Sequence, residues 1–479
     1  MKPVISRALS LSALLVLNGC SLLPMVGPDY QLPSFSLPAF WSTTPTTAAT
    51  APASELASWW RQLDDPLLDR LIDEALAGSV DLKLAQSRLQ QARASREQAV
   101  SGLFPALTAS AGASRNKSSS AISTLPTRTL YDAGFDASWE IDLFGGTWRG
   151  VEAATAELAA SQASLHNVRV SLLAEVAQNY VELRAFQHRL AIARDNLASQ
   201  SETVQITEWR NQAGLASSSD VEQARTSREQ TRASIPDLEI GRVAAENRLA
   251  VLLGKNPGAL HGELAEMKDF PPVPASVGAG IPADVLRQRP DLIVAERTLA
   301  AETARLGQKQ AQRFPSLNLG GSFGWQAYSF GALGGSDTLM RAISGTLAAT
   351  LFDGGRLRSA VAIQSAVQEQ ALLSYQSGVL GALEEVENAL TAYAASRERL
   401  EARQAAAEAA RNAASLARNL YQSGLTDFQK VLETERTRLS AEDSLATAQG
   451  NRLTSLITLY KALGGGWQQA APTTENEKS

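Results

Sequence analysis

The chain has 479 residues, a formal net charge of −5 and an aromatic content of only 6%. Its charges are mixed in sign and form no basic run, so nucleic acid is not expected as a partner. The single cysteine, Cys20, excludes an intramolecular disulfide.

Residues 1–19 are predicted to be a lipoprotein signal peptide. Lys2 and Arg7 form a positively charged region before an apolar run, Ala8–Leu17, that is too short to span a bilayer but typical of a signal peptide. The run leads into Leu-Asn-Gly-Cys, which resembles the lipobox of bacterial lipoproteins and ends at Cys20. We therefore expect cleavage before Cys20 and a covalent diacylglycerol and N-acyl lipid on it, with no other cofactor. The alternative is an ordinary signal peptide with an incidental cysteine.

Residues 20–55 are rich in Pro, Ser, Thr and Ala, which predicts a lipidated, extended N-terminal tether and not a folded module. The residue after the cysteine is Ser21 and not an aspartate. By resemblance to bacterial lipoproteins, this permits transport to the outer membrane.

The rest of the chain consists of two similar halves that are offset by 210 residues. An internal repeat of this kind sets the architecture. The anchors are Phe104-Pro105-Ala106-Leu107 with Phe314-Pro315-Ser316-Leu317, Gly214-Leu215 with Gly424-Leu425, and Leu253-Gly254 with Leu463-Gly464. The predicted divisions are repeat 1 at 56–254, a linker or equatorial segment at 255–282, repeat 2 at 283–467 and a disordered tail at 468–479.

Each repeat is predicted to contain a helix, then a pair of strands, and then a very long helix. A helix is predicted from Asp65-Pro66 to about Leu103, with a break at Gly78. The segments near 105–143 and near 315–352 alternate apolar and polar residues with period two, which indicates strands. Long helices follow, over 151–213 and 356–423, and each ends at a Gly-Leu turn before a returning helix.

The strand runs are about nine to eleven residues long, which is the length that a tilted strand needs to cross a bilayer. Half-buried strands of a soluble sheet are the commoner source of such alternation. Two strand pairs would supply four membrane strands, and the smallest closed barrels have about eight. Unpaired strand edges are not tolerated in lipid, so oligomerisation is expected, with eight strands in a dimer and twelve in a trimer.

Several further motifs resemble the TolC/OprM outer-membrane factors, specifically the lipoprotein (NodT-type) branch of efflux systems of the resistance-nodulation-division (RND) class. These motifs are Val26-Gly27-Pro28-Asp29-Tyr30, Ile281–Asp291 with Ala295-Glu296, Leu351-Phe352-Asp353-Gly354-Gly355, and Leu459–Trp467. The resemblance covers essentially the whole mature chain in the expected order.

The resemblance implies an α+β membrane protein with a two-fold internal repeat. Long antiparallel α-helices would form a periplasmic α-barrel continuous with a transmembrane β-barrel, built from four strands per subunit and twelve in a homotrimer. It also implies contact with outer-membrane lipid, a periplasmic adaptor protein and an RND inner-membrane pump. The expected location is the outer membrane, lipid-anchored and spanned by strands, with a long periplasmic extension.

The resemblance places a periplasmic gate at the turn into the last long helix, at Gln429, Lys430, Glu433 and Arg436. In repeat 1, Asp220 occupies the position that matches Lys430, so a contact between Lys430 and Asp220 of neighbouring tips is conceivable. Rings of charge at a narrow neck would set selectivity. The alternative is that Lys430, Glu433 and Arg436 form ordinary pairs on a solvated helix face.

No enzymatic or metal-binding constellation is visible, because the three histidines are scattered and lack ligand spacing. The resemblance implies a passive exit duct for small molecules such as antibiotics, and we expect no enzyme. Two alternatives fit the same sequence: a duct for type I protein secretion, and a lipid-anchored helical scaffold without a pore.

Overall fold

The computed structural model describes residues 25–42, 56–117, 126–274 and 287–467. The predicted signal peptide and Cys20 lie outside these residues, as do the predicted tail and parts of the tether and linker. The chain divides into two compact units, and each unit contains segments of both repeats. Unit 1 comprises 1–34, 88–162 and 293–376, and unit 2 comprises 35–87, 163–292 and 377–479.

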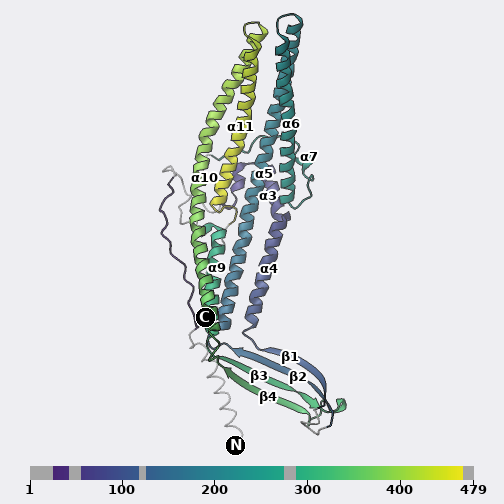
Figure 1. Cartoon of the computed structure of the whole chain (residues 1–479), viewed down its shortest axis with the longest axis vertical. Helices are drawn as coiled ribbons and strands as arrows, with labels where there is room; N and C mark the ends of the chain where they lie inside the picture. The colour runs from purple at the N-terminus through teal and green to yellow at the C-terminus, as the bar shows by residue number, and fades with distance from the viewer. Residues whose placement is uncertain (1–24, 43–55, 118–125, 275–286, 468–479) are drawn as a thin grey trace. The chain divides into compact units, whose positions relative to one another are not determined.

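Unit 1 contains one antiparallel sheet of four strands in the order β1-β2-β3-β4 (Figure 1). The strands are β1 (Ala106–Asn116), β2 (Arg128–Ile141), β3 (Ser316–Ala327) and β4 (Leu339–Ala348). They fall within the two predicted strand pairs. The two repeats therefore combine their strands into one sheet, with β2 of the first repeat paired to β3 of the second.

The two faces of the sheet differ as the alternation predicts. On one face Phe135 lies opposite Phe323, and Trp139 lies opposite Leu319. On the other face Asp136 lies opposite Ser322. None of the described residues covers the apolar face at Ile343 of β4, whose side chain is 95% exposed.

The helices repeat with the same offset as the sequence. Within the described residues, the helices are the 3₁₀ helices η1 (Trp59–Leu63) and η2 (Phe330–Ala332), together with α3 (Pro66–Gly78), α4 (Val80–Ser101), α5 (Gly146–Gln212), α6 (Ser218–Leu252), α7 (His261–Leu264), α9 (Pro290–Ala311), α10 (Arg356–Gln422) and α11 (Phe428–Ala462). Both α5 and α10 contain 67 residues, and both α6 and α11 contain 35. The predicted architecture of one subunit, with long antiparallel helices, four strands and a two-fold repeat, is confirmed.

One boundary differs from the sequence prediction, because α5 begins at Gly146 and not near residue 151. The Asp142 carboxylate accepts a hydrogen bond from the Trp148 amide at 2.8 Å and so satisfies one of the free amides at the start of the helix. Gly145, at φ +76°, supplies the left-handed conformation just before it. The glycine pair therefore opens the helix.

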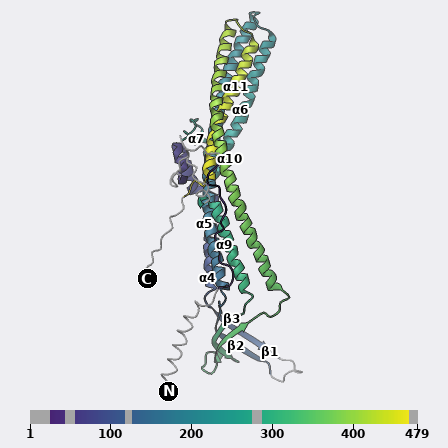
Figure 2. The same cartoon turned by 90° about the vertical axis from the view of Figure 1, so that its left-hand side faces the viewer.

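Unit 2 has its main core where η1 and α3 meet α5 and the end of α11. The Trp59 and Tyr460 rings stack with centroids 5.2 Å apart, among buried leucines such as Leu63 and Leu68. Beyond this core, the C-terminal parts of α5 and α10 run beside α6 and α11 as a four-helix bundle (Figures 1 and 2). Among the described residues, no helix is both long enough and apolar enough to cross a membrane.

Candidate functional site

The tip of the bundle in unit 2 is formed by two glycine turns that have the same geometry. The Leu215 amide donates to the Arg210 carbonyl at 2.7 Å, and the Leu425 amide donates to the Leu420 carbonyl at 2.9 Å. Gly214 and Gly424 have φ values of +75° and +76°. This is the bonding pattern of a Schellman motif, in which glycine avoids the strain of a left-handed residue. Each long helix therefore reverses sharply into its partner.

The helices that leave the turns begin with different caps. In repeat 1, Ser217 and Asp220 form a capping box, in which the Asp220 carboxylate accepts from the Ser217 amide at 2.9 Å. In repeat 2, Asp427 caps the helix by accepting from the Lys430 amide at 3.0 Å. The predicted gate residue Asp220 is thus occupied in holding its own helix end.

The other predicted gate residues are exposed on the first turns of α11. The Lys430 ammonium lies 3.0 Å from the Glu433 carboxylate, one turn away on the same helix. The Gln429 side-chain amide donates to the Gln223 side chain on α6 at 2.6 Å, which joins the two hairpins. No contact between Lys430 and Asp220 occurs among the described residues of the chain, so a contact between neighbouring tips stays a prediction. Arg436 lies further along α11 and lines a separate recess.

A small apolar cluster lies beneath the tip and fixes the two hairpins to each other. Its buried members come from all four helices: Val204, Ala224, Tyr421, Phe428, Val431 and Leu432. Arg210, at the end of α5, lies over the Tyr421 ring at 4.5 Å and donates to the Tyr421 carbonyl at 2.7 Å. The tip is therefore a packed junction beneath a polar surface.

Two buried carboxylates lie further along α11. Glu435 is 4% exposed and accepts from Arg418 of α10 and from Thr203 of α5, both at 3.0 Å. Glu442 is 6% exposed and accepts from Arg411 of α10 at 2.9 Å and from Asn196 of α5 at 3.3 Å.

These contacts form two similar layers, each with an arginine of α10, a glutamate of α11 and a polar residue of α5. Within each helix the two layer residues are seven positions apart, which is about two helical turns and returns to the same face. We call them the polar layers. Each layer links α10, α11 and α5, so it ties the second hairpin to the first.

The first repeat contains the same ion pair with the charges exchanged. Glu208 on α5 and Arg225 on α6 are the counterparts of Arg418 and Glu435, and they lie 2.8 Å apart. Both are considerably more exposed than Glu435. The polar layers were not predicted from the sequence, because buried charges on a charge-rich helix have the same residue types as its solvated face. Opposite charges at matching positions of the two repeats are the signal that could have revealed them.

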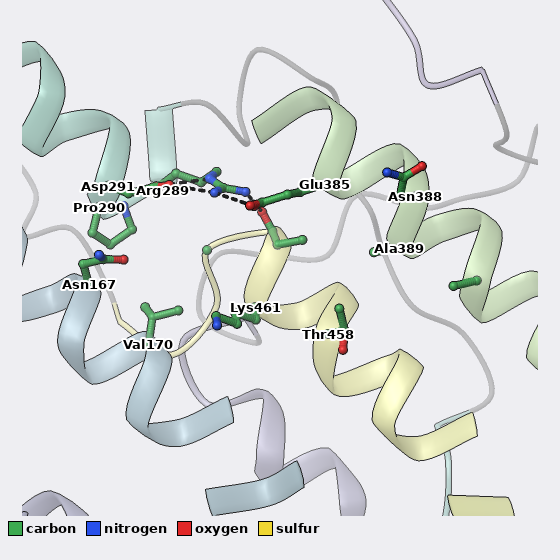
Figure 3. Close-up of a pocket in the computed structure, with 13 residues that line it drawn as sticks. Asn167, Val170, Arg289, Pro290, Asp291, Glu385, Asn388, Ala389, Thr458 and Lys461 are labelled. Atoms are coloured by element: carbon green, nitrogen blue, oxygen red, sulfur yellow. Dashed lines mark hydrogen bonds and ion pairs between the residues drawn. The ribbon is translucent and has the colours of Figure 1, made fainter. Parts of the chain in front are cut away.

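A second junction in unit 2 surrounds Arg289, which precedes α9 (Figure 3). Its guanidinium makes a bidentate contact with Asp291 at 3.1 and 2.7 Å, and a third contact with Glu385 of α10 at 2.7 Å. It also donates to the carbonyl of Ala462, the last residue of α11, at 3.0 Å. These groups line a cavity of about 550 Å³.

Burial lowers the pKa of Arg289, but Asp291 and Glu385 more than offset that effect, so its pKa is raised and it stays charged. The side chain is only 9% exposed. Arg289 therefore cross-links the start of α9, the middle of α10 and the end of α11. The sequence placed it in a motif without indicating this role.

In unit 1, the segment that follows the predicted lipidation site packs against two helices. The buried Arg149 of α5 lies 2.7 Å from Asp29 and donates to the Gly27 carbonyl at 3.2 Å. The Tyr30 hydroxyl donates to Glu296 of α9 at 2.6 Å. Residues 25–42, the described part of the tether, contain no helix or strand, and these contacts hold Gly27, Asp29 and Tyr30.

The described residues contain no group of three or more His, Cys, Asp or Glu side chains that could hold a metal ion. Their distinctive features are the open sheet, the long bundle and the charged junctions within it.

Comparison with known proteins identifies the same architecture. The family model described as outer membrane efflux protein matches residues 71–255 and again 281–465, one match in each repeat. The pyoverdine export outer membrane protein OpmQ of Pseudomonas putida is 32% identical over 463 residues, which are 95% of this chain and 97% of OpmQ. The toluene efflux pump outer membrane protein TtgC of Pseudomonas putida is 30% identical over 477 residues, 97% of this chain and 96% of TtgC.

Among solved structures, the outer-membrane channel OprN is similar, with a TM-score of 0.87 and 37% identity. The match covers 93% of this chain and 100% of the OprN chain.

Proposed function

The chain belongs to the family of outer membrane efflux proteins, and we propose that it is the exit duct of a tripartite efflux pump. It is a protein of the bacterial outer membrane. In this proposal, small molecules such as antibiotics pass from the periplasm to the exterior through a closed ring of strands and helices. The duct itself is not an enzyme, because the energy comes from a partner pump.

The observation that carries the proposal is the open sheet. Its outer strands are β1 and β4, which pair with β2 and β3 but not with each other among the described residues. In lipid, each unpaired backbone group costs several kcal/mol, so these edges need partners. Copies of the same chain can supply them, β4 of one pairing with β1 of the next. Three copies would give a ring of twelve strands, consistent with the even numbers found in bacterial barrels.

The mass of the purified protein tests whether the ring contains three copies of the chain. We expect light scattering of the detergent-solubilised full chain to give three copies per particle after subtraction of the detergent. A stable particle with one or two copies would contradict the twelve-stranded ring.

The remaining partners follow from the chemistry of a passive conduit. A duct without its own energy source needs a pump in the inner membrane, which we propose is of the RND class, and a periplasmic adaptor between the two. TtgC, which is similar over nearly the whole chain, is the outer membrane protein of a toluene efflux pump. We also propose that Cys20 carries a diacylglycerol and an N-acyl chain, which would hold the N-terminus at the membrane.

A charge placed on the apolar face of β4 should prevent assembly in the membrane. Ile343, which is 95% exposed on that face, would meet lipid in the proposed ring. We expect Ile343→Arg to cost about 2–4 kcal/mol at mid-membrane depth. The measurement is the fraction of oligomer recovered in outer-membrane extracts, which should fall severalfold.

Ser344→Arg is the matched control, because Ser344 is the next residue on the same strand and belongs to the opposite face. That variant should assemble nearly as the unaltered chain does. Equal losses in both variants would show that this strand does not face lipid on one side only.

Loosening the tip should raise the resting conductance. Gln429→Ala removes the hydrogen bond to Gln223 that joins the two hairpins at the tip. A hydrogen bond of this kind contributes about 1 kcal/mol, so the open population should rise roughly fivefold. Single-channel recording measures the change, with Gln404→Ala on the exposed middle of α10 as the control. If Gln429→Ala leaves the conductance unchanged, the contact between Gln429 and Gln223 does not help to keep the gate closed.

A further inference from the structure

A recess in the bundle of unit 2 remains unexplained by the architecture. It has a volume of about 530 Å³ and lies between α5, α6 and α11. Its floor is formed by the buried residues Ala193, Gln200, Ser227 and Thr231. Pockets of roughly 300–1,000 Å³ hold small organic molecules. The recess is therefore large enough for such a ligand.

Short side chains on α6 create the space. Ser227, Thr231 and Ser234 follow one another at spacings of four and three residues, so they lie on one face of the helix. Pro236 lies inside α6 just beyond them. A proline has no amide hydrogen, so the carbonyl four residues earlier loses its helical donor. The α6 wall of the recess therefore has short side chains and lacks one helical backbone hydrogen bond.

The charges that line the recess are balanced but not all paired. Arg189 and Asp443 pair with each other at 2.6 Å. Asp237 of α6 and Arg436 of α11 also line the recess, and neither forms an ion pair or a side-chain hydrogen bond within the described residues. The recess therefore presents one anion from α6 and one cation from α11.

The floor adds an unsatisfied polar atom. Gln200 is 3% exposed, and its Oε1 has no hydrogen-bond partner among the described residues. A buried acceptor that is left unpaired costs about 1–3 kcal/mol, which a bound donor would recover. This is a second and independent indication that the recess accommodates a polar ligand.

The recess lies on the side of α5 away from residues 264–270. Gln187 and His188 of α5 contact the carbonyls of Leu264 and Lys268. Ala193 and Gln200 lie about half a turn around the helix from these two residues. In the proposed ring, residues 264–270 would block the duct if they pointed inward, so we infer that they lie on its outside and that the recess faces the lumen.

We propose that this recess is a transient binding site on the wall of the duct for zwitterionic small molecules. Arg436 binds the carboxylate of the ligand, Asp237 binds its ammonium group, and Gln200 accepts a hydrogen bond from it. This inference rests on the proposed function, because the recess meets cargo only if the bundle encloses the duct. Binding must be weak enough for the ligand to leave, as in any conducting site.

The test is equilibrium binding to the detergent-solubilised full chain, measured by saturation-transfer NMR with two probes. Ampicillin carries a carboxylate and an ammonium group, and benzylpenicillin has the same carboxylate without the ammonium group. We expect ampicillin to bind more tightly. Arg436→Gln should weaken the binding of both probes, by roughly tenfold for a charge-assisted contact. Asp237→Asn should abolish only the preference for ampicillin.

Arg403→Gln and Glu398→Gln remove the same charges from exposed positions on α10 and serve as controls. Both should bind the probes as the unaltered chain does. The inference is overturned if neither probe binds, or if Asp237→Asn retains the preference for ampicillin. The measurement does not depend on conduction, so a chain that conducts but binds neither probe would reject the recess and leave the duct intact.

Discussion

Replacing Arg289 with alanine is expected to lower the stability of the protein by about 3 kcal/mol. The substitution leaves Asp291 and Glu385 without their shared cation and leaves the carbonyl of Ala462 without its donor. Breaking a buried pair in this way costs about 3–5 kcal/mol, and we take the lower value because Glu385 is 62% exposed. The measurement is the urea midpoint of the helical circular-dichroism signal in detergent.

Two further variants make this result specific. Arg289→Lys keeps the charge but cannot make the bidentate contact with Asp291, so it should lose an intermediate amount of stability. Lys461→Ala removes a cation that lines the same cavity and forms no ion pair within the described residues, so its midpoint should hardly move. If Arg289→Ala and Lys461→Ala unfold at the same urea concentration, Arg289 does not hold this junction together.

The second large effect is expected in the polar layers. Glu435→Arg would place two cations together at a buried site, beside Arg418 and Thr203. We expect a loss of about 3–5 kcal/mol, together with faster proteolysis of the tip because the second hairpin is no longer tied to α5. The measurements are the urea midpoint and the rate of cleavage by trypsin.

The double variant Glu435→Arg with Arg418→Glu should recover much of this loss. The first repeat uses that exchanged arrangement, with Glu208 on α5 and Arg225 on α6. The matched control exchanges Glu208 and Arg225, and it should cost less than about 1 kcal/mol because exposed pairs contribute little. A double variant no more stable than Glu435→Arg alone would show that the charge pair is not what stabilises the layer.

Much of the fold could be predicted because the two repeats of the chain can be compared with each other. The Gly-Leu pairs at Gly214 and Gly424 predicted where both long helices end, since glycine is favoured in the left-handed turn that each end requires. The alternation through Phe135 and Trp139 predicted which face of the sheet is apolar, because side chains alternate along a strand. Local rules sufficed wherever a single residue type determines the backbone.

The contacts of the candidate gate were harder to predict, because they depend on distances between helices. Lys430 pairs with Glu433 on its own helix, which is the alternative that the spacing already offered. The contact between Gln429 and Gln223 joins residues 206 positions apart, and nothing local to either residue indicates it. Glu435 is a charged residue, as its solvent-exposed neighbours on α11 are. Only its position in three dimensions therefore reveals that it is buried.

The most direct test of the duct is conductance in a planar bilayer with the purified, oligomeric full chain. The account predicts small stepwise currents from the unaltered protein and larger steps from Glu433→Lys, which turns the pair at the tip into like charges. Absence of current from both proteins, with their oligomers intact, would contradict the proposal that this chain forms a channel.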